Sequence, residues 1–208
     1  TRLTAASALG EIEDIRAAER LASLVRDADP AVRLAAVEAL GQLDDYRGTD
    51  ALTGVLKDRD VRVRRAAAQS LANVESAKAA GPLADALTDS DPVVRRLAAQ
   101  ALGELDGLKR APPRLVSALS DRDSELSVIA AMSLGQIGDT TVVPALTTAY
   151  RSENPRLRYA VVSALSDIDD YRGDDLLSTA SKDRDQAVRR KAAETLRDRN
   201  HDKDDDHD

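Results

Sequence analysis

The sequence predicts an all-α protein, an α-solenoid in which about six to seven helical hairpins stack into a right-handed superhelix. The first observation is an internal repeat. One leucine recurs every 31 residues, with a single interval of 32, at Leu9, Leu40, Leu71, Leu102, Leu134, Leu165 and Leu196. The second is composition, because the chain is 42% hydrophobic but only 2% aromatic, with no Phe and no Trp. An interior of Ala, Leu, Val and Ile suits close packing of helix on helix.

The longer helix of each repeat is marked by apolar residues on one face. Counted from the anchor leucine, positions −8, −4, −1, 0 and +3 are apolar or small, as in Val94, Ala98, Ala101, Leu102 and Leu105. This spacing is one face of a helix. An N-cap acceptor followed by Pro marks the start of the helix, at Asp29-Pro30, Asp91-Pro92 and Asn154-Pro155.

A second, shorter helix follows in each repeat, with its own apolar residues three to four apart. It is visible in "DALTGVL", "GPLADAL", "VVPALTTAY" and "DDLLSTA". The period is therefore one helical hairpin, and hairpins must stack because neither helix buries its apolar face alone. The sequence predicts a repeat array over residues 1–199, followed by an acidic, disordered tail at 200–208, "HDKDDDHD" with its preceding Asn.

The pattern in "DSDPVVRRLAAQALGEL" at 89–105 resembles a HEAT repeat. The short period and the endings "ALGEL", "ALGQL" and "SLGQI" resemble the PBS-lyase HEAT-like subclass in particular. The resemblance covers residues 2 to about 199 and implies an armadillo-like α-solenoid. HEAT arrays mostly act as interaction surfaces, so it implies the fold more specifically than the function.

The resemblance also implies a structural ladder of charged residues. In HEAT arrays an Asp in the turn between the helices and an Arg six residues on bond within and between neighbouring repeats. The matching positions here are Asp27 and Arg33, Asp58 and Arg64, Asp89 and Arg95, and Asp183 and Arg189. Two repeats depart: in the fifth, Asp121 faces Ser127, and in the next one Ser152 precedes Arg158. We expect a looser interface at the fifth repeat.

Two recurring acidic patterns favour scaffold roles. The Asp-x-Asp pairs at 27/29, 58/60, 89/91, 121/123 and 183/185 lack the Gly and Glu of a calcium loop and run directly into a helix, which favours the ladder and the N-cap. The pentapeptide "DDYRG" occurs at 44–48 and 169–173, in the same slot four repeats apart. We expect its second Asp to cap a helix and its Tyr to lean on an apolar edge. The alternative is that Tyr46, Arg47, Tyr171 and Arg172 form exposed contacts.

The net charge of −7 opposes non-specific binding to nucleic acid or to anionic membranes. The chain uses Arg far more than Lys and Asp far more than Glu. This usage resembles that of proteins from salt-loving microbes, although a GC-rich genome also favours Arg over Lys. No apolar run is long enough to span a membrane, and the first residues, "TRLTAASALG", lack the charged-then-apolar order of a signal peptide, although a native signal could precede them. We expect a soluble, cytoplasmic monomer. The chain begins with Thr1 inside the repeat pattern, which suggests a fragment or a trimmed product.

Catalytic and metal sites are not predicted. The chain has no cysteine, and its two histidines, His201 and His207, lie in the tail. No nucleophile–base set, phosphate loop or repeated His-Glu pair is present. The sequence therefore predicts no cofactor.

The favoured function is a non-catalytic scaffold that binds a protein or peptide on the concave face of the array. The second helix of each HEAT hairpin lines that face, and its outward positions hold Arg62, Arg65, Arg96, Val128, Met132, Arg156, Tyr159 and Arg190. Arg, Tyr and Met are enriched at protein interfaces, and this set indicates an acidic or mixed partner. The alternatives are a phycobilin lyase-like protein that handles a chromophore, which is the enzyme that the resemblance implies, and a nucleic-acid-binding module.

Overall fold

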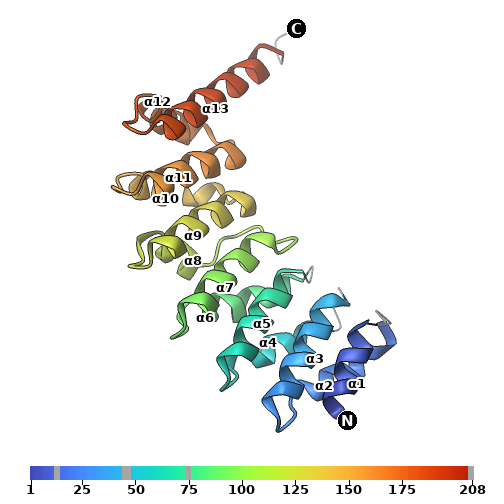
Figure 1. The fold of residues 1–208 in the computed structure, drawn as a ribbon. Coiled ribbons are helices and arrows are strands. Elements are labelled where there is room, and N and C mark those ends of the chain that lie inside the picture. Colours follow the sequence, from blue (N-terminus) through green and yellow to red (C-terminus); the bar gives the residue numbers. More distant parts are fainter. Residues whose placement is uncertain (12–14, 44–47, 74–75, 206–208) are drawn as a thin grey trace. The chain divides into compact units, whose positions relative to one another are not determined.

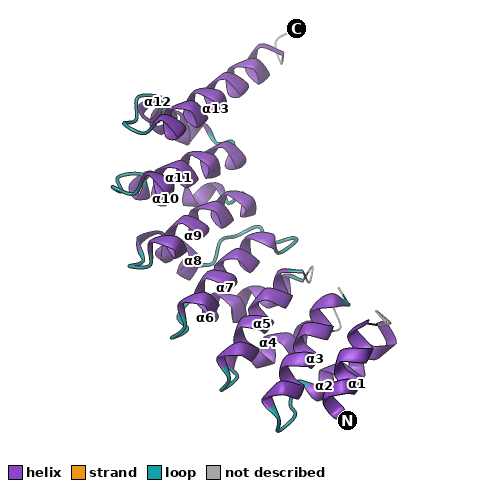
Figure 2. Cartoon of the chain, viewed as in Figure 1, coloured by secondary structure: helices purple, strands orange, loops and turns teal. Residues whose placement is uncertain are grey.

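The computed structural model describes residues 1–11, 15–43, 48–73 and 76–205. Over these residues the chain is helical, with turns and loops between the helices and no strand (Figure 2). The chain divides into two compact units, Thr1–Leu108 (unit 1) and Lys109–Asp208 (unit 2). The predicted all-α repeat fold is confirmed within each unit, while the superhelix over the whole chain stays a prediction.

Unit 1 has two layers of helices. The longer helices α1 (Arg2–Glu11), α3 (Pro30–Gln42), α5 (Val61–Ala72) and α7 (Pro92–Glu104) pack side by side in chain order (Figure 1). The shorter helices α2 (Ala18–Leu24), α4 (Thr49–Gly54) and α6 (Ala80–Ala86) form the second layer, each against the longer helix that follows it. Short 3₁₀ turns precede or extend them at η1 (Ile15–Ala17), η3 (Val55–Lys57) and η4 (Ala77–Ala79).

Unit 2 repeats the arrangement. Its longer helices α9 (Ser124–Ile137), α11 (Pro155–Ile168) and α13 (Gln186–Asp205) pack in a row. The shorter helices are α8 (Pro113–Ser117), α10 (Val143–Ala149) and α12 (Asp174–Ala180), with 3₁₀ turns η5 (Ala118–Ser120), η6 (Thr140–Val142) and η7 (Tyr171–Gly173). Helix α13 continues past residue 199, where the sequence predicted the array to end. The disordered tail stays a prediction.

From α3 onward, each longer helix starts where the sequence predicts a cap. The N-cap side chain accepts a hydrogen bond from a backbone N–H of the first turn, at Asp29, Asp60, Asp91, Asp123, Asn154 and Asp185. The preceding Asp of the pair accepts from the backbone N–H of the cap residue, as Asp58 does from Asp60 at 2.8 Å. Both carboxylates of the Asp-x-Asp pattern therefore fix the turn into the helix.

The core lies between the two layers and is built almost entirely from Ala, Leu and Val. The anchor leucines of the central repeats are fully buried, at Leu40, Leu71, Leu102, Leu134 and Leu165. Side chains this small allow close approach of the longer helices. A Cβ on Gly41 would lie 2.3 Å from the Ser70 Oγ, and one on Gly135 would lie 2.7 Å from the Ala164 Cα.

Candidate functional site

The charged ladder joins neighbouring repeats within each unit. The Arg33 Nη1 donates to the backbone carbonyl of Asp27 at 2.9 Å, while its Nε and Nη2 fork onto the Asp58 carboxylate at 2.8 and 2.9 Å. Arg64 makes the same contacts with the Asp58 carbonyl and the Asp89 carboxylate. The predicted partners thus meet through the backbone, and the side-chain ion pair crosses to the following repeat. Arg95 and Arg189 also donate to the carbonyls of Asp89 and Asp183.

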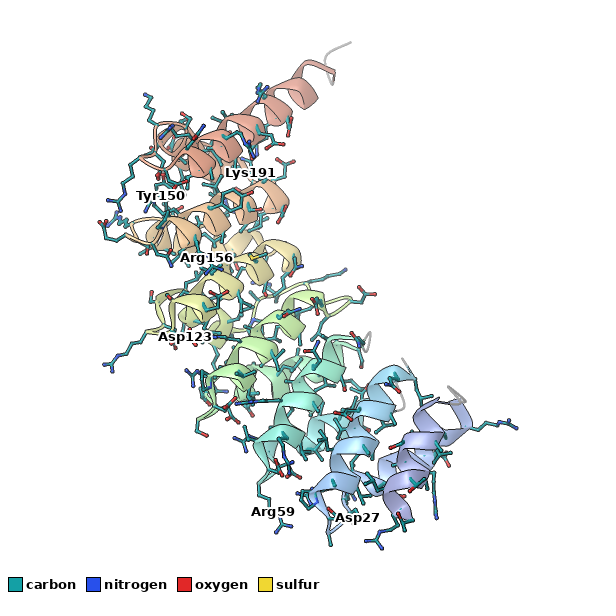
Figure 3. All side chains as sticks on the ribbon, viewed as in Figure 1. Asp27, Arg59, Asp123, Tyr150, Arg156 and Lys191 are labelled. Atoms are coloured by element: carbon teal, nitrogen blue, oxygen red, sulfur yellow. The ribbon has the colours of Figure 1, made fainter. Side chains whose placement is uncertain are left out.

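The most buried rung of the ladder is Arg158 with Asp183 in unit 2, where each side chain is 5% exposed. The Arg158 fork holds both carboxylate oxygens at 2.8 and 2.9 Å, and the Tyr150 hydroxyl donates to the same group. Tyr150, labelled in Figure 3, directly follows α10. The hydrogen bonds from Arg158 outweigh burial and hold the pKa of Asp183 well below its usual range, while burial and the Asp183 carboxylate raise the pKa of Tyr150.

The fifth repeat lacks a rung, as the sequence predicts. The Ser127 Oγ donates to the Asp121 carbonyl at 3.3 Å, in place of the missing arginine. Arg156 instead forks onto Glu125 at 2.7 and 3.1 Å. This exposed ion pair joins α11 to α9 at the protein surface. The expected looser interface is wrong for the helices themselves, because Gly135 brings α9 and α11 into close contact. A polar slot of about 290 Å³, lined by Ser127 and Ser152 among others, lies at the missing rung.

The second "DDYRG" copy is largely a connector. Asp170 accepts from the Arg172 backbone N–H at 2.9 Å and from its guanidinium, and these bonds lower the pKa of Asp170 to about 2. Arg172 also reaches the Thr140 carbonyl of the preceding repeat at 3.1 Å. The predicted cap is confirmed. The expected apolar contact of Tyr171 is wrong, because Tyr171 is 79% exposed.

The first "DDYRG" copy, residues 44–47, lies outside the described residues. Its glycine, Gly48, is described and buried. A Cβ on Gly48 would lie 3.3 Å from the Leu40 Cδ2, and one on Gly173 would lie 3.2 Å from the Leu165 Cδ2. The final glycine of both copies therefore makes room for an anchor leucine.

The predicted binding residues of unit 1 are already engaged inside the unit. Arg62 pairs with Asp60 at 2.7 Å, and Arg65 forks onto Asp91 at 2.6 and 3.0 Å. The hydrogen bond from Arg65 lowers the pKa of Asp91 to about 2. Arg96 is half-buried on α7. The ion pairs of Arg62 and Arg65 belong to the scaffold, which the sequence pattern did not reveal.

Four of the five predicted binding residues of unit 2 come together in a groove. Its volume is about 430 Å³, and its walls are Val128, Met132, Pro155, Arg156, Tyr159, Ala160, Ser163, Asp185 and Ala187. Met132 and Tyr159 are exposed apolar side chains, at 53% and 42%. Arg156, labelled in Figure 3, lines the groove while it is paired with Glu125. Arg190 is exposed on α13 but does not line the groove.

Sequence reasoning missed the contribution of Asp185, which it assigned only to a helix cap. The repeat carried the signal, because Asp185 lies 26 residues after Tyr159, just as Asp91 lies 26 residues after Arg65. Each of these aspartates caps the next longer helix. Within the described residues, no three His, Asp or Glu side chains gather as a metal site requires. No helix within the same residues is long and apolar enough to span a membrane.

The family model for HEAT repeats matches residues 1–72, 49–126 and 112–197. The chain belongs to the HEAT-repeat family. The predicted family is thereby confirmed, and its repeats account for both layers of each unit. No protein among those of curated function matches the chain.

Solved structures with the same fold include natural and designed repeat proteins. A complex of CpcE and CpcF of phycocyanin lyase from Nostoc sp. is 25% identical, with a TM-score of 0.63 over 86% of this chain and 75% of that one. An archaeal HEAT-like repeats protein from Thermococcus onnurineus is 16% identical, with a TM-score of 0.66 over 93% and 90%. A designed armadillo repeat protein in complex with the peptide (KR)4 is 19% identical, with a TM-score of 0.60 over 80% and 91%.

Proposed function

We propose that the protein is a non-catalytic scaffold that binds a protein or peptide on the face formed by its longer helices, the face that is concave in a HEAT solenoid. The observation that carries the proposal is the groove of unit 2, where Met132 and Tyr159 stand exposed on adjacent helices. Exposed apolar side chains that gather in a groove of this size are typical of a binding site. Tyr and Met are also enriched at protein interfaces.

The groove can be tested by comparing two exposed tyrosines. Tyr159→Ala with Met132→Asp removes the apolar contacts of the groove, whereas Tyr171→Ala removes a tyrosine that is 79% exposed on the connection before α12. Immobilised wild-type protein and the Tyr171→Ala variant should retain the same partner from an extract of the native host. The groove variant should lose it while its helical circular dichroism stays unchanged. Equal retention by all three proteins would contradict the proposal.

A bilin lyase-like role is the second candidate. It is favoured by the 25% identity to the phycocyanin lyase complex over 86% of the chain, which comes with a groove of ligand size. Phycocyanobilin added to the protein should then change its visible absorbance spectrum, and the change should disappear in the Tyr159→Ala, Met132→Asp variant. An unchanged spectrum would leave the scaffold as the function.

The cytoplasmic location, the monomeric state and the absence of nucleic-acid or membrane partners belong to the same proposal. The net charge of −7 supports this part of the proposal, since a negative charge repels anionic polymers and surfaces.

Adaptation to salt is proposed from the same charge. Repulsion between like charges weakens as the Debye length falls to about 3 Å at about 1 M salt, so the melting temperature should rise with potassium chloride. A melting temperature that stays flat or falls would contradict adaptation to salt and leave a GC-rich genome as the explanation of the high arginine content.

A further inference from the structure

The N-cap aspartates of the longer helices have one oxygen that the helix does not need. Asp91 caps α7 with its Oδ1, which accepts from the backbone N–H groups of Val93 and Val94 at 3.0 Å. Its Oδ2 accepts from the Arg65 Nη2 at 2.6 Å, and the Arg65 Nε also reaches Oδ1. The arginine comes from the preceding longer helix, 26 residues earlier. The second oxygen of this cap is thus used to bind a guanidinium.

Unit 2 has the same cap without the arginine. Asp185 caps α13 with its Oδ1, which accepts from the backbone N–H groups of Ala187 and Val188 at 2.9 and 3.2 Å. The residue 26 positions earlier is Tyr159. Over the described part of unit 2, Asp185 forms no ion pair and its Oδ2 accepts no hydrogen bond. The carboxylate lines the groove beside Tyr159.

The two arginines of α11 are held by other carboxylates. Arg158, a buried residue of α11, has its fork on Asp183. Arg156, on the groove wall, has its fork on Glu125. The groove therefore offers one carboxylate at the edge of an apolar surface made by Tyr159, Met132 and Val128, in a protein of net charge −7.

We infer that the groove of unit 2 binds an arginine side chain of a basic protein or peptide, with its guanidinium on Asp185 and its stem against Tyr159 and Met132. The guanidinium would take the place on Asp185 that the Arg65 guanidinium takes on Asp91. Arginine fits better than lysine, because a planar fork matches a carboxylate and stacks on an aromatic ring. This inference rests on the proposed function and replaces the acidic or mixed occupant expected from the sequence, since Arg62, Arg65 and Arg156 are already paired.

The only methionine in the sequence gives a direct probe of the groove. Protein labelled with ¹³C at the methionine methyl carries a resonance from Met132, which Met132→Leu assigns by removing it. It is titrated with three blocked tripeptides, acetyl-Leu-Arg-Leu-amide and the same peptide with citrulline or glutamate at the centre. Citrulline keeps the shape of arginine without its charge. The arginine peptide should shift the resonance, the citrulline peptide should bind about tenfold more weakly, and the glutamate peptide should bind least.

Matched variants test the assignment to Asp185. Asp185→Asn removes the charge but keeps the cap, since Asn154 already caps α11 in the same position. It should weaken the arginine peptide about tenfold and leave the citrulline peptide unchanged. Asp29→Asn changes the equivalent cap of α3 in unit 1, which does not line the groove, and should have no effect. Tyr159→Arg should abolish peptide binding, because Arg would bind Asp185 from within the chain as Arg65 binds Asp91.

Each result decides a separate question. Equal affinity for the arginine and citrulline peptides, or an arginine affinity that Asp185→Asn leaves intact, would overturn the arginine assignment while peptide binding in the groove stands. A Met132 resonance that no peptide shifts would overturn the assignment as well. The proposed scaffold function would then be judged by partner retention on the Tyr159→Ala, Met132→Asp variant, which does not depend on arginine.

Discussion

Two neighbouring junctions in unit 2 occupy the same register and are built from different chemistry. Between α11 and α13, Arg158 and Asp183 form a forked ion pair whose side chains are 5% exposed. Between α9 and α11, the same two positions hold Ser127 and Ser152. There the helices approach closely at Gly135 instead.

The difference teaches that a rung of the ladder is kept or lost as a pair. Loss of one partner alone would leave the other charge buried, which costs several kcal/mol, whereas loss of both leaves no charge to satisfy. Ser127 and Ser152 are neutral, and each makes a hydrogen bond within its own turn, to the Asp121 carbonyl and from the Asn154 backbone N–H. The α3–α5 junction combines the Arg33–Asp58 pair with a close approach at Gly41, so the serine junction shows that close packing can join two hairpins without the charged pair.

Breaking the charged junction should have the largest effect. Asp183→Ala leaves Arg158 buried without a carboxylate and removes the acceptor of Tyr150, so the free energy of unfolding should fall by about 3–5 kcal/mol. Urea denaturation followed by circular dichroism measures it. Ser152→Ala, in the same register at the serine junction, should cost less than about 1 kcal/mol. Comparable losses in the two variants would contradict the ranking of the junctions.

Acid should weaken the charged junction selectively. The pKa of Asp183 is lowered in the folded protein, so its stabilisation is complete above the unfolded-state pKa of about 3.9 and is lost as the pH falls below that value. The difference in unfolding free energy between wild type and Asp183→Asn should stay constant from about pH 7 to about pH 5 and shrink below about pH 4. Urea denaturation at each pH checks it. A difference that grows in acid would reverse the sign of the pKa shift.

Close packing at the serine junction can be tested with one methyl group. In Gly135→Ala the new Cβ would lie 2.7 Å from the Ala164 Cα, so α9 and α11 must separate. Overpacking costs about 1–3 kcal/mol and the gain in helix propensity returns about 1, which leaves a net loss of up to about 2 kcal/mol. Gly81→Ala is the control, because a Cβ there has no neighbour within 4 Å, and it should stabilise α6. Stabilisation by both substitutions would show that the helices tolerate separation.

Restoring the missing rung should have the smallest effect. Ser127→Arg and Ser152→Asp together rebuild the pattern of Arg158 and Asp183 in a slot of about 290 Å³. Each single variant buries a lone charge and should destabilise, while the double variant should recover a coupling energy of about 1 kcal/mol in a double-mutant cycle. Additive effects would mean that the slot does not orient the new pair as the neighbouring junction does.

The sequence was sufficient for the fold because each contact in a repeat array is made again one period later. The leucine period located the core, and the buried side chains of Leu40 and Leu165 confirm it in both units. The Asp-Pro and Asn-Pro starts located the caps of α3, α7 and α11. Both signals are local, so neither depends on how the units are placed.

The site was predictable only in part. Val128, Met132, Arg156 and Tyr159 do line one groove, as their outward positions indicate. The ion pairs of Arg65 and Arg156 were not predicted, because their partners lie 26 residues later and 31 residues earlier and depend on how one hairpin stacks on the next. Tyr171 was predicted to rest on an apolar edge, but Asp170 and Arg172 hold the turn so that the ring points into solvent.

Where a rung of the ladder is complete, its arginine binds an aspartate 25 residues further along the chain, so a period with a complete rung carries one donor and one acceptor. Duplication of a period by unequal crossing-over therefore adds one of each, and the new junction is paired as soon as it folds. Removal of a whole period joins the donor of one hairpin to the acceptor of a later one. An array of this kind can grow or shrink in a single genetic event without an intermediate that buries a lone charge.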